Sequence, residues 1–359
     1  MYRRSCNCFL LFVFVTKTSH ANIDTYFEVN TFFYSEPVAI SALKTGWNTP
    51  IQSGDIIFTT DRFELGVAWE NWQLGLQYRY DYYFNFTPET ANLIHASKNK
   101  IELIPGQQYP INLQVNGVRT RGFKLARSII IKQGLSISSA FTLLEGVEFM
   151  SGGLWGQASA VSAKDYNVDF EVDYAYSKDP VFERRAEIPK SMGYSLDLVL
   201  SWLPTKSIEM KLEILDVFSK VKWNNAPYTK ATGDSNNKEY DESGYVKYNP
   251  VISGVESNRD YTQKIPRKIF IGGSYQILDE YALALEYSDF DVEDFLYFGL
   301  SRSINEHKKV SVLYCIEAHA TSFSYLTRNF SLELITDKIS VNKARLFGLK
   351  LSYVLMTWR

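Results

Sequence analysis

The chain has 359 residues, which suffices for one large all-β domain or for two ordinary domains. Its 38 lysines and arginines against 40 aspartates and glutamates leave a formal charge of −2, which excludes the strongly basic surface that nucleic-acid binding requires. Aromatic residues reach 15% and charged residues 22%, a balance typical of a chain whose apolar and polar residues are interleaved.

The N-terminus, MYRRSCNCFLLFVFVTKTSHA, has the three parts of a secretory signal peptide. Two arginines precede the short apolar run Cys8–Val15, and Ser19–Ala21 forms a small-x-small cleavage site. Residues 1–21 are therefore predicted to be removed, which would leave Cys315 as the single cysteine and no intramolecular disulfide. Beyond them no apolar run approaches the roughly twenty residues that a membrane helix needs.

From there on, apolar and polar residues alternate along most of the chain, which is the period of a β-strand with two different faces. In the row from Tyr166 to Tyr176 every second residue is apolar or aromatic, and the residues between them are mostly acidic. The pattern indicates strands of about ten to fourteen residues, the length of a tilted strand that crosses a bilayer rather than a strand of a soluble sheet. We count fifteen such strands, beginning near residues 24, 62, 73, 119, 135, 147, 165, 191, 207, 266, 281, 295, 307, 321 and 344.

The links between these strands are of two kinds. Very short links lie near 70–72, 133–134, 145–146, 163–165, 203–207, 278–280, 291–294 and 305–307. Long polar links lie at 35–61, 87–118, 178–190 and 224–265, and all four follow odd-numbered strands. Alternate links of an up-and-down barrel emerge on the same side, so the pattern favours short periplasmic turns and long extracellular loops.

Aromatic residues gather at both ends of the predicted strands, as they do at the two interfaces of a bilayer. The positions at the short-turn ends are Trp69, Trp72 and Trp202, and those at the long-loop ends are Tyr80, Tyr82, Tyr174, Tyr176 and Trp223. Two belts at two heights indicate a transmembrane antiparallel β-barrel.

With these features the chain resembles the Gram-negative outer-membrane β-barrel proteins of the porin and fatty-acid-transporter kind. The resemblance is carried by the signal-like N-terminus, by hairpins such as YSLDLVLSWLPTKSIEMKLEIL, and by the last strand RLFGLKLSYVLMTWR. It implies an all-β barrel in the bacterial outer membrane, surrounded by outer-membrane lipid and inserted by the assembly machinery. Such proteins usually end in an aromatic residue in register with the outward row, whereas here Arg359 is last and Trp358 has the inward parity.

Single-chain barrels have an even number of strands, so the expectation is 14 or 16, with one strand misread between 295 and 345. Residues 22–359 are expected to form one barrel domain, in which 22–61 is partly a plug or a loop.

The polar rows are expected to face the inside of the barrel, where carboxylates outnumber lysines and arginines. This predicts a passive channel for small solutes whose lumen mildly favours cations. An alternative is that these charges pair across strands and fill a narrow barrel. The candidate lumen-lining residues that would set selectivity are Arg79, Asp169, Glu171, Asp173, Asp197, Glu209, Lys211, Glu213 and Glu286.

Other functions remain open from the sequence. A non-conducting surface adhesin, or the barrel component of an envelope assembly, would use loop 224–265 as its contact surface. A fatty-acid-type transporter for hydrophobic compounds would use 22–61 as a plug, although the acidic inner rows argue against a greasy lumen. A soluble periplasmic all-β protein is a weaker alternative.

Neither an enzyme nor a cofactor or metal site is expected. His95, His307 and His319 are too scattered for a metal cluster of recognisable spacing. A hydrolase that pairs His319 with a nearby serine, Ser322 or Ser324, is a weak alternative, because geometry rather than composition makes a catalytic triad. Cys315 is interpreted as a small packed residue.

Overall fold

The computed structural model describes residues 23–179, 182–234, 238–248 and 251–355. The expected signal peptide, together with Trp358 and Arg359, lies outside the described residues.

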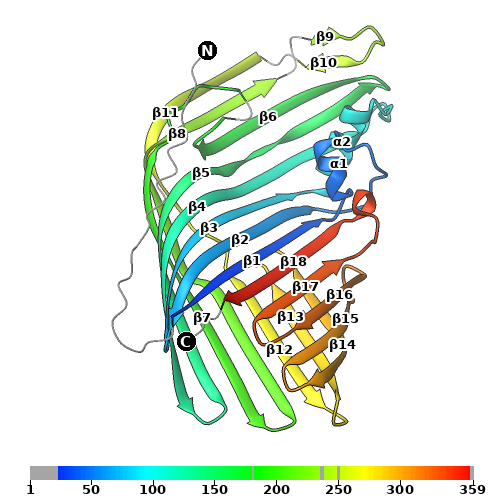
Figure 1. Ribbon diagram of the computed structural model, residues 1–359. Coiled ribbons are helices and arrows are strands. Elements are labelled where there is room, and N and C mark those ends of the chain that lie inside the picture. Colours follow the sequence, from blue (N-terminus) through cyan, green and yellow to red (C-terminus); the bar gives the residue numbers. More distant parts are fainter. Residues whose placement is uncertain (1–22, 180–181, 235–237, 249–250, 356–359) are drawn as a thin grey trace, which may run out of the picture.

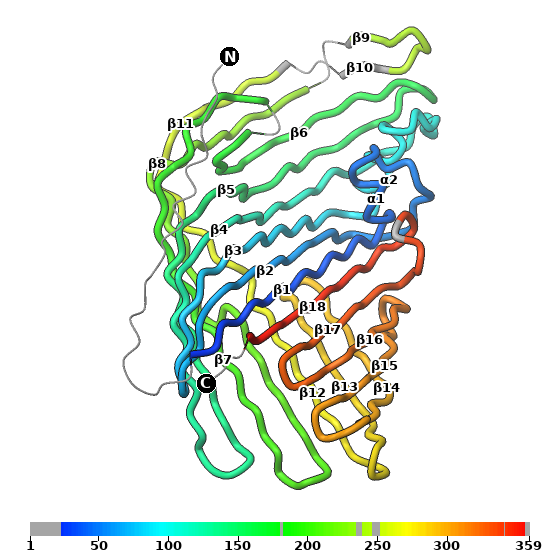
Figure 2. Tube along the Cα trace, in the orientation of Figure 1, coloured from blue at the N-terminus to red at the C-terminus, as the bar shows by residue number. Residues whose placement is uncertain are grey.

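Within the described residues, fourteen antiparallel strands close into a single barrel. Figures 1 and 2 show its curved wall. The sheet closes because the last strand pairs with the first, with Val29 opposite Leu351, and the free ends of both strands lie at the same end of the barrel. The lower of the two strand numbers expected from the sequence is therefore confirmed. The wall strands are β1 (Ile23–Ser35), β2 (Ile56–Trp69), β3 (Trp72–Phe86), β4 (Gln108–Lys132), β5 (Leu135–Ser162), β7 (Lys190–Thr205), β8 (Ile208–Asp234), β12 (Lys268–Gln276), β13 (Tyr281–Asp289), β14 (Asp294–Asn305), β15 (Lys308–Cys315), β16 (Ala320–Leu326), β17 (Phe330–Thr336) and β18 (Leu346–Leu355).

On the side of the long loops the wall extends beyond the barrel. The strand β6 (Asp165–Tyr176) pairs with the upper parts of β5 and β8, whose lower parts flank β7 instead. The strand β11 (Val251–Gln263) continues this extension along β8. The remaining elements on this side are α1 (Ile40–Lys44), α2 (Pro88–Asn99), the hairpin of β9 (Lys238–Tyr240) and β10 (Val246–Tyr248), and η1 (Val341–Lys343).

The helix α2 begins and ends on standard local signals. Thr87 is its N-cap and its hydroxyl accepts a hydrogen bond from the Thr90 amide at 3.3 Å, while Pro88 occupies the first turn, where no amide donor is needed. The helix ends at Lys100, which has the left-handed backbone conformation common after a helix. Leu93 of this helix packs against Ala158 and Val168 of the wall extension, so α2 covers the inner face of the mouth.

The outward face of the wall is a band of exposed apolar side chains. In hydrocarbon an unpaired backbone amide costs several kcal/mol, and a closed sheet leaves none of its strands with a free edge. The band is the surface that a barrel spanning a membrane turns toward lipid. Representative members are Leu65, Leu76, Phe123, Phe141, Ile271, Leu285, Phe298, Val312, Phe323, Leu334 and Tyr353.

Among the described residues, no helix has both the length and the apolar character needed to cross a membrane.

The count of fifteen strands from the sequence differs from the observed fourteen because two strands were counted in excess and one was left out. β5 is one strand of 28 residues that the sequence pattern divides at 145–146, where the register of the β4–β5 pair shifts. β6 belongs to the extension rather than to the closed barrel, and β17 was missed. Within 22–61, β1 and β2 are wall strands, and residues 36–55, which include α1, form the link between them.

If the apolar band faces lipid, a cation placed in its middle must lower stability. Leu76 is 62% exposed and lies between the two aromatic ends of β3, so Leu76→Arg is expected to reduce the free energy of unfolding by about 2–4 kcal/mol. The matched control is Leu203→Arg at a hairpin end, which should cost about 0–1 kcal/mol. Urea titration of the barrel folded in lipid vesicles measures both. Equal costs would show that Leu76 does not face hydrocarbon.

Candidate functional site

A network of buried ion pairs crosses the inside of the barrel at mid-height. Arg79 of β3 makes a two-bond contact with Asp216 of β8, with Nη1–Oδ1 2.8 Å and Nη2–Oδ2 2.5 Å. Lys268 of β12 lies 2.7 Å from Asp81 and 3.4 Å from Asp216. Because β4, β5 and β7 separate β3 from β8 along the wall, these bonds span the lumen rather than join neighbouring strands.

A break in the regular pairing places Asp216 in this network. Asp216 has a positive φ of 58°, and the β7–β8 register shifts beside it, which turns its side chain inward as a β-bulge does. The backbone amide of Asp216 donates to the Asp197 carboxylate at 2.8 Å, and the Ser195 hydroxyl donates to the Asp216 carboxylate at 2.7 Å. The bulge therefore ties together β7 and β8, which carry two of the three carboxylates of the network, Asp197 and Asp216.

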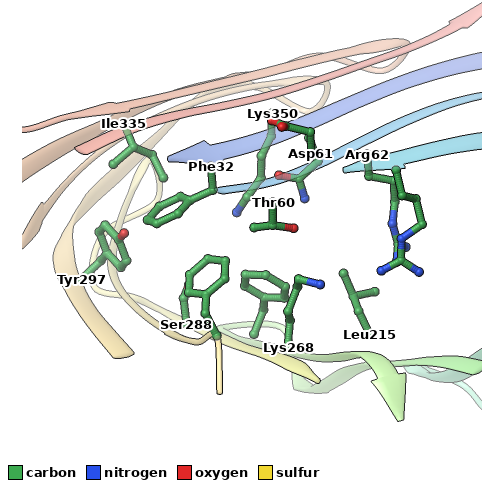
Figure 3. Close-up of a pocket in the computed structure, with 14 residues that line it drawn as sticks. Phe32, Thr60, Asp61, Arg62, Leu215, Lys268, Ser288, Tyr297, Ile335 and Lys350 are labelled. Atoms are coloured by element: carbon green, nitrogen blue, oxygen red, sulfur yellow. The ribbon is translucent and has the colours of Figure 1, made fainter. Parts of the chain in front are cut away.

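The network is electrically balanced. Its third cation, Arg62 of β2, bonds Asp197 at 2.9 Å, so three cations face three carboxylates. The cavity between them is about 20 Å³, which is room for roughly one water. Figure 3 shows Arg62 and Lys268 converging on this space together with Phe32, Leu215 and Tyr297. The interior at this height is thus closed and neutral.

A second buried carboxylate, Glu64 of β2, is neutralised in the same way. Lys124 of β4 lies 2.7 Å from it, and Tyr26 of β1 and Gln77 of β3 donate to it at 2.6 and 3.1 Å. The structure therefore supports, for these groups, the alternative in which inward charges pair across strands.

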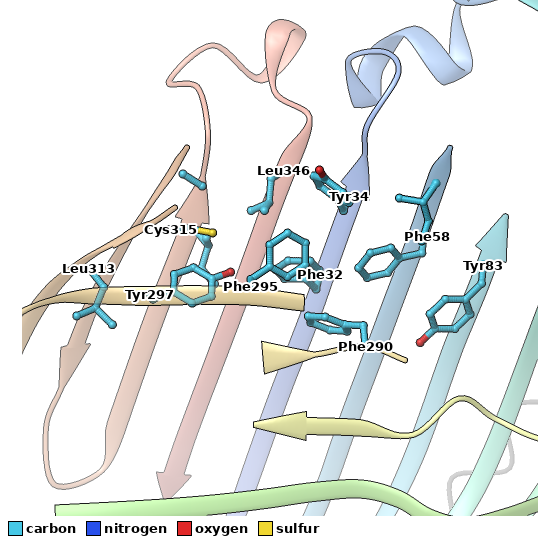
Figure 4. Packing of buried hydrophobic residues seen from close by; sticks show 13 residues of the cluster. Phe32, Tyr34, Phe58, Tyr83, Phe290, Phe295, Tyr297, Leu313, Cys315 and Leu346 are labelled. Atoms are coloured by element: carbon cyan, nitrogen blue, oxygen red, sulfur yellow. The ribbon is translucent and has the colours of Figure 1, made fainter. Parts of the chain in front are cut away.

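An aromatic cluster lies beside the ion network and also reaches across the lumen (Figure 4). Phe32 of β1 stacks on Phe290, which lies in the link between β13 and β14, with ring centroids 4.5 Å apart. Phe58 stacks on Tyr83 at 5.6 Å and meets Phe290 at 5.1 Å. The loop-side link at 290–293 thus folds inward and helps to close the barrel.

Above this level large aromatic and apolar side chains fill much of the interior. Trp223 of β8 is fully buried, stacks on Phe149 of β5 at 4.3 Å, and donates from its indole nitrogen to Gln263 at 3.2 Å. Gly146 lies under the Trp223 ring, where an added Cβ would come within 2.1 Å of it. Glycine is needed at this position because the ring occupies the space of a side chain.

On β6 the two faces are the reverse of those expected. The predicted lumen residues Asp169, Glu171 and Asp173 lie on the outer face, where Lys230 binds Glu171 at 3.0 Å. The aromatic row, including Tyr174 and Tyr176, is buried inside instead. The reason is that β6 stands above the membrane, so water bathes its outer face while other apolar groups cover its inner face. The assignments of Tyr174, Tyr176 and Trp223 to an interface belt are wrong for the same reason.

The other predicted lumen residues do point inward, and they lie at two heights. Arg79 and Asp197 belong to the buried network. The other four line a polar vestibule of about 320 Å³ at the short-turn end, together with Lys309, Glu333 and Lys350. These four are Glu209, Lys211, Glu213 and Glu286.

Ion pairs run through this vestibule. Lys211 binds Glu213 at 2.9 Å, and Lys350 binds Glu333 at 2.9 Å. Charge on the inner wall is therefore largely compensated here as well.

The remaining belt residues lie near the outer surface. Trp69, Trp72 and Trp202 are at least partly exposed at the short-turn ends of their strands. Tyr80 and Tyr82 stack on each other at 4.5 Å on the outward face of β3, with the Arg119 guanidinium 5.1 Å from the Tyr80 ring.

A second pocket lies at the mouth, and we call it the mouth pocket. It has about 300 Å³ and is lined mainly by apolar side chains of α2 and its surroundings, among them Leu93, Ile101, Leu103 and Tyr166. The pocket lies on the loop side of the barrel, between α2 and the link from β5 to β6.

The β9–β10 hairpin is fastened over the mouth pocket. Lys100 Nζ lies 2.6 Å from the Asp241 carboxylate, and the Tyr245 hydroxyl donates to the Lys100 carbonyl at 2.9 Å. Lys164 Nζ donates to the Ser243 carbonyl at 3.1 Å. Asp241 and Tyr245 also line the pocket, so these contacts form a latch at its edge.

Sequence reasoning did not single out Arg62, Asp216 or Lys268 for the network. Asp216 and Lys268 sit at irregular points, next to the β8 bulge and at the first residue of β12. A two-residue period carries no signal for a bulge, which makes such positions hard to find from sequence.

The candidate hydrolase residues are not brought together. His319 Nδ1 bonds the hydroxyl of Tyr314 at 2.9 Å, whereas the Ser322 hydroxyl donates to Glu333 at 2.9 Å. His95 bonds the Thr49 carbonyl at 3.1 Å and ties α2 to the first loop. In the described part of the chain, no group of three or more His, Cys, Asp or Glu side chains could hold a metal ion.

Neither a protein-family model nor a curated protein matches the chain. Among solved structures, the toluene transporter TodX of P. putida is similar over 95% of this chain and 91% of its own, with a TM-score of 0.42 and 9% identity. The CymD monoaromatic hydrocarbon channel covers 95% and 90%, with a TM-score of 0.41 and 11% identity. A Pseudomonas aeruginosa FadL homologue covers 93% and 89%, with a TM-score of 0.27 and 9% identity.

The buried network has a testable energetic signature. Removing one partner of a buried ion pair leaves the other charge buried and uncompensated, so Arg79→Leu is expected to lower the free energy of unfolding by about 3–5 kcal/mol. Arg79→Leu/Asp216→Leu leaves the network balanced and should cost clearly less than the two single changes added together. Arg121→Leu, which removes an exposed partner of Glu145, is the control and should cost about 0–1 kcal/mol. Additive costs in the double-mutant cycle would show that Arg79 and Asp216 do not interact.

The latch at the mouth pocket is expected to depend on pH. The hydrogen bond from Lys100 holds the pKa of Asp241 below its ordinary value. The contact between Lys100 and Asp241 is then fully formed at a pH above the ordinary pKa of an aspartate, and it is lost as the pH falls through the lowered pKa of Asp241. Spin labels at Asn92→Cys and Glu242→Cys should report a longer distance across the mouth at acidic pH. With Asp241→Asn the distance should be long at every pH, and an unchanged distance in that variant would contradict the latch.

Proposed function

We propose that the chain is an outer-membrane transporter that admits small, largely apolar compounds, in place of the cation-favouring open channel expected from the sequence. One observation carries the proposal, namely that clusters of apolar and aromatic side chains fill much of the interior from the mouth pocket down to the constriction at mid-height. Three of the acidic residues that speak against a greasy lumen, Asp169, Glu171 and Asp173, lie on the outer face instead.

The route that we propose has three stages. A compound enters the mouth pocket beneath the β9–β10 hairpin and then moves between the buried rings of Tyr174, Tyr176 and Trp223. Next it meets the aromatic cluster and the neutral ion network, where side chains must shift for it to pass because the cavity holds about one water. It leaves through the polar vestibule into the periplasm.

The closed constriction disfavours free ion flow. A permanently open pore needs a continuous aqueous path, whereas here Arg79–Asp216 and Phe32–Phe290 contacts join opposite walls. A balanced set of charges also has little reason to attract either ion sign. We therefore expect gated passage of single molecules and propose no catalytic step.

Uptake measurements test the mouth pocket directly. Leu103→Glu puts a carboxylate among buried apolar groups, so cells carrying it should accumulate an uncharged monoaromatic probe about tenfold more slowly than the parent. The control is the next residue, Ile104→Glu, whose side chain is exposed and should leave uptake unchanged. Equal uptake by parent, Leu103→Glu and cells without the protein would contradict the proposal and favour the non-conducting surface protein.

Planar-bilayer recordings separate this transporter from an open channel. The parent protein should show no sustained conductance steps, because mid-height side chains block the lumen. Long-lived cation-selective steps from the parent would restore the open-channel interpretation.

A further inference from the structure

The wall of the barrel is interrupted near the loop side between β11 and β12. β8 pairs with β11 as far as Val221 and with β12 from Leu215 downward, and between these points residues 264–267 leave the ladder. The Ser219 hydroxyl replaces the missing backbone bonds, since it donates to the Ile265 carbonyl at 2.9 Å and accepts from the Ile265 amide at 3.0 Å. A hollow of about 640 Å³ results, and we call it the wall hollow.

Three cations border the wall hollow without a carboxylate partner. Lys220, Lys264 and Arg267 are all exposed, and within the described residues no ion pair involves any of them. Lys220 points outward on β8, because the neighbouring Val221 is buried inside the barrel, and Lys264 and Arg267 are exposed beside the hollow in the irregular segment 264–267.

The charges around the hollow leave a net positive site. Asp291 is the one carboxylate at its rim, whereas the carboxylate of Asp216 at its base is already taken by Arg79 and Lys268. The nearest other lysine, Lys222, is paired with Asp260 at 3.0 Å. Three cations against one exposed carboxylate leave the hollow about two charges positive.

The hollow lies where the apolar band ends. On the outward face of β8 the apolar residues continue to Phe218, which is 66% exposed, and the next two outward residues are Lys220 and Lys222. On β7 the half-exposed ring of Tyr194 lies directly opposite Lys220. A change from apolar to cationic side chains marks the height of the lipid headgroups of the outer leaflet.

We propose that the wall hollow binds the phosphate headgroup of a phosphorylated glycolipid in the outer leaflet. A phosphomonoester carries about −1.5 to −2 charges at neutral pH, which matches the charge of the site. Lys220, Lys264 and Arg267 hold the phosphate, while the acyl chains lie on the apolar band beneath Phe218 and Tyr194. The bound lipid covers the interruption in the wall and so shields the backbone of 264–267 from hydrocarbon.

Lipid binding to the full chain in detergent tests this site. The probe is a bisphosphorylated, acylated glucosamine disaccharide, and its affinity is compared for the parent and for Lys220→Gln/Lys264→Gln/Arg267→Gln. Loss of three cations at the headgroup should weaken binding by about tenfold or more. The control triple, Arg121→Gln/Lys230→Gln/Arg302→Gln, removes the same charge from exposed cations that have carboxylate partners, and should change affinity less than about twofold.

Two further probes identify the chemistry that is recognised. The same glycolipid without phosphates should bind as weakly to the parent as the complete lipid binds to the first triple variant. Inorganic phosphate should not compete at equal concentration, because it lacks the chains that lie on the apolar band. Equal weakening in both triple variants, undiminished binding of the dephosphorylated lipid, or full competition by inorganic phosphate would each overturn the proposal. Heat-modifiable gel migration checks that each variant is folded, and uptake of the monoaromatic probe is independent of the outcome.

Discussion

The structure depends on the closing of one sheet, in which β18 returns to pair with β1. In a medium without water every backbone amide and carbonyl needs a partner within the protein, and a sheet meets this demand only when it has no free edge. Closure in turn dictates long tilted strands, an even strand number with both ends on the same side, and an outward apolar row on each strand. The interruption between β11 and β12 along β8 follows the same rule, because the hydroxyl of Ser219 takes over the bonds that the ladder loses there.

The inside of the closed wall is filled by different kinds of side chains at different heights. The upper part is packed with stacked rings such as Trp223 on Phe149, whereas the middle holds Arg79, Asp216 and their partners. Buried ion pairs are costly to desolvate and add little stability over an apolar packing, so their presence at the narrowest point is better explained by specificity than by stability. A balanced, hydrogen-bonded network is rigid and fixes one arrangement of the side chains at this height.

Much of the fold was predictable because alternation is a local property. A row such as Tyr194 to Trp202 indicates a strand with two faces, whatever it pairs with. The errors in the strand boundaries arose where the local sequence pattern differs from the pairing of the strands. The shift near Gly146 looks like a turn, although it is a register shift inside one long strand. β17 has only seven residues and alternates weakly, so its existence is evident only from its partners, β16 and β18.

By itself, the sequence determined the class of protein: an all-β chain whose strands are long enough to cross a membrane, with short turns on one side and long loops on the other. Only the tertiary structure decided which face of each strand is inside. Alternation shows that a strand has two different faces but not which of them is inside. The acidic row of Glu171 and the aromatic row of Tyr174 are therefore equally good candidates for the lumen until the height of β6 above the membrane is known. The ion network was beyond reach for a related reason, since Arg79 and Asp216 are 137 residues apart and meet only because the sheet closes.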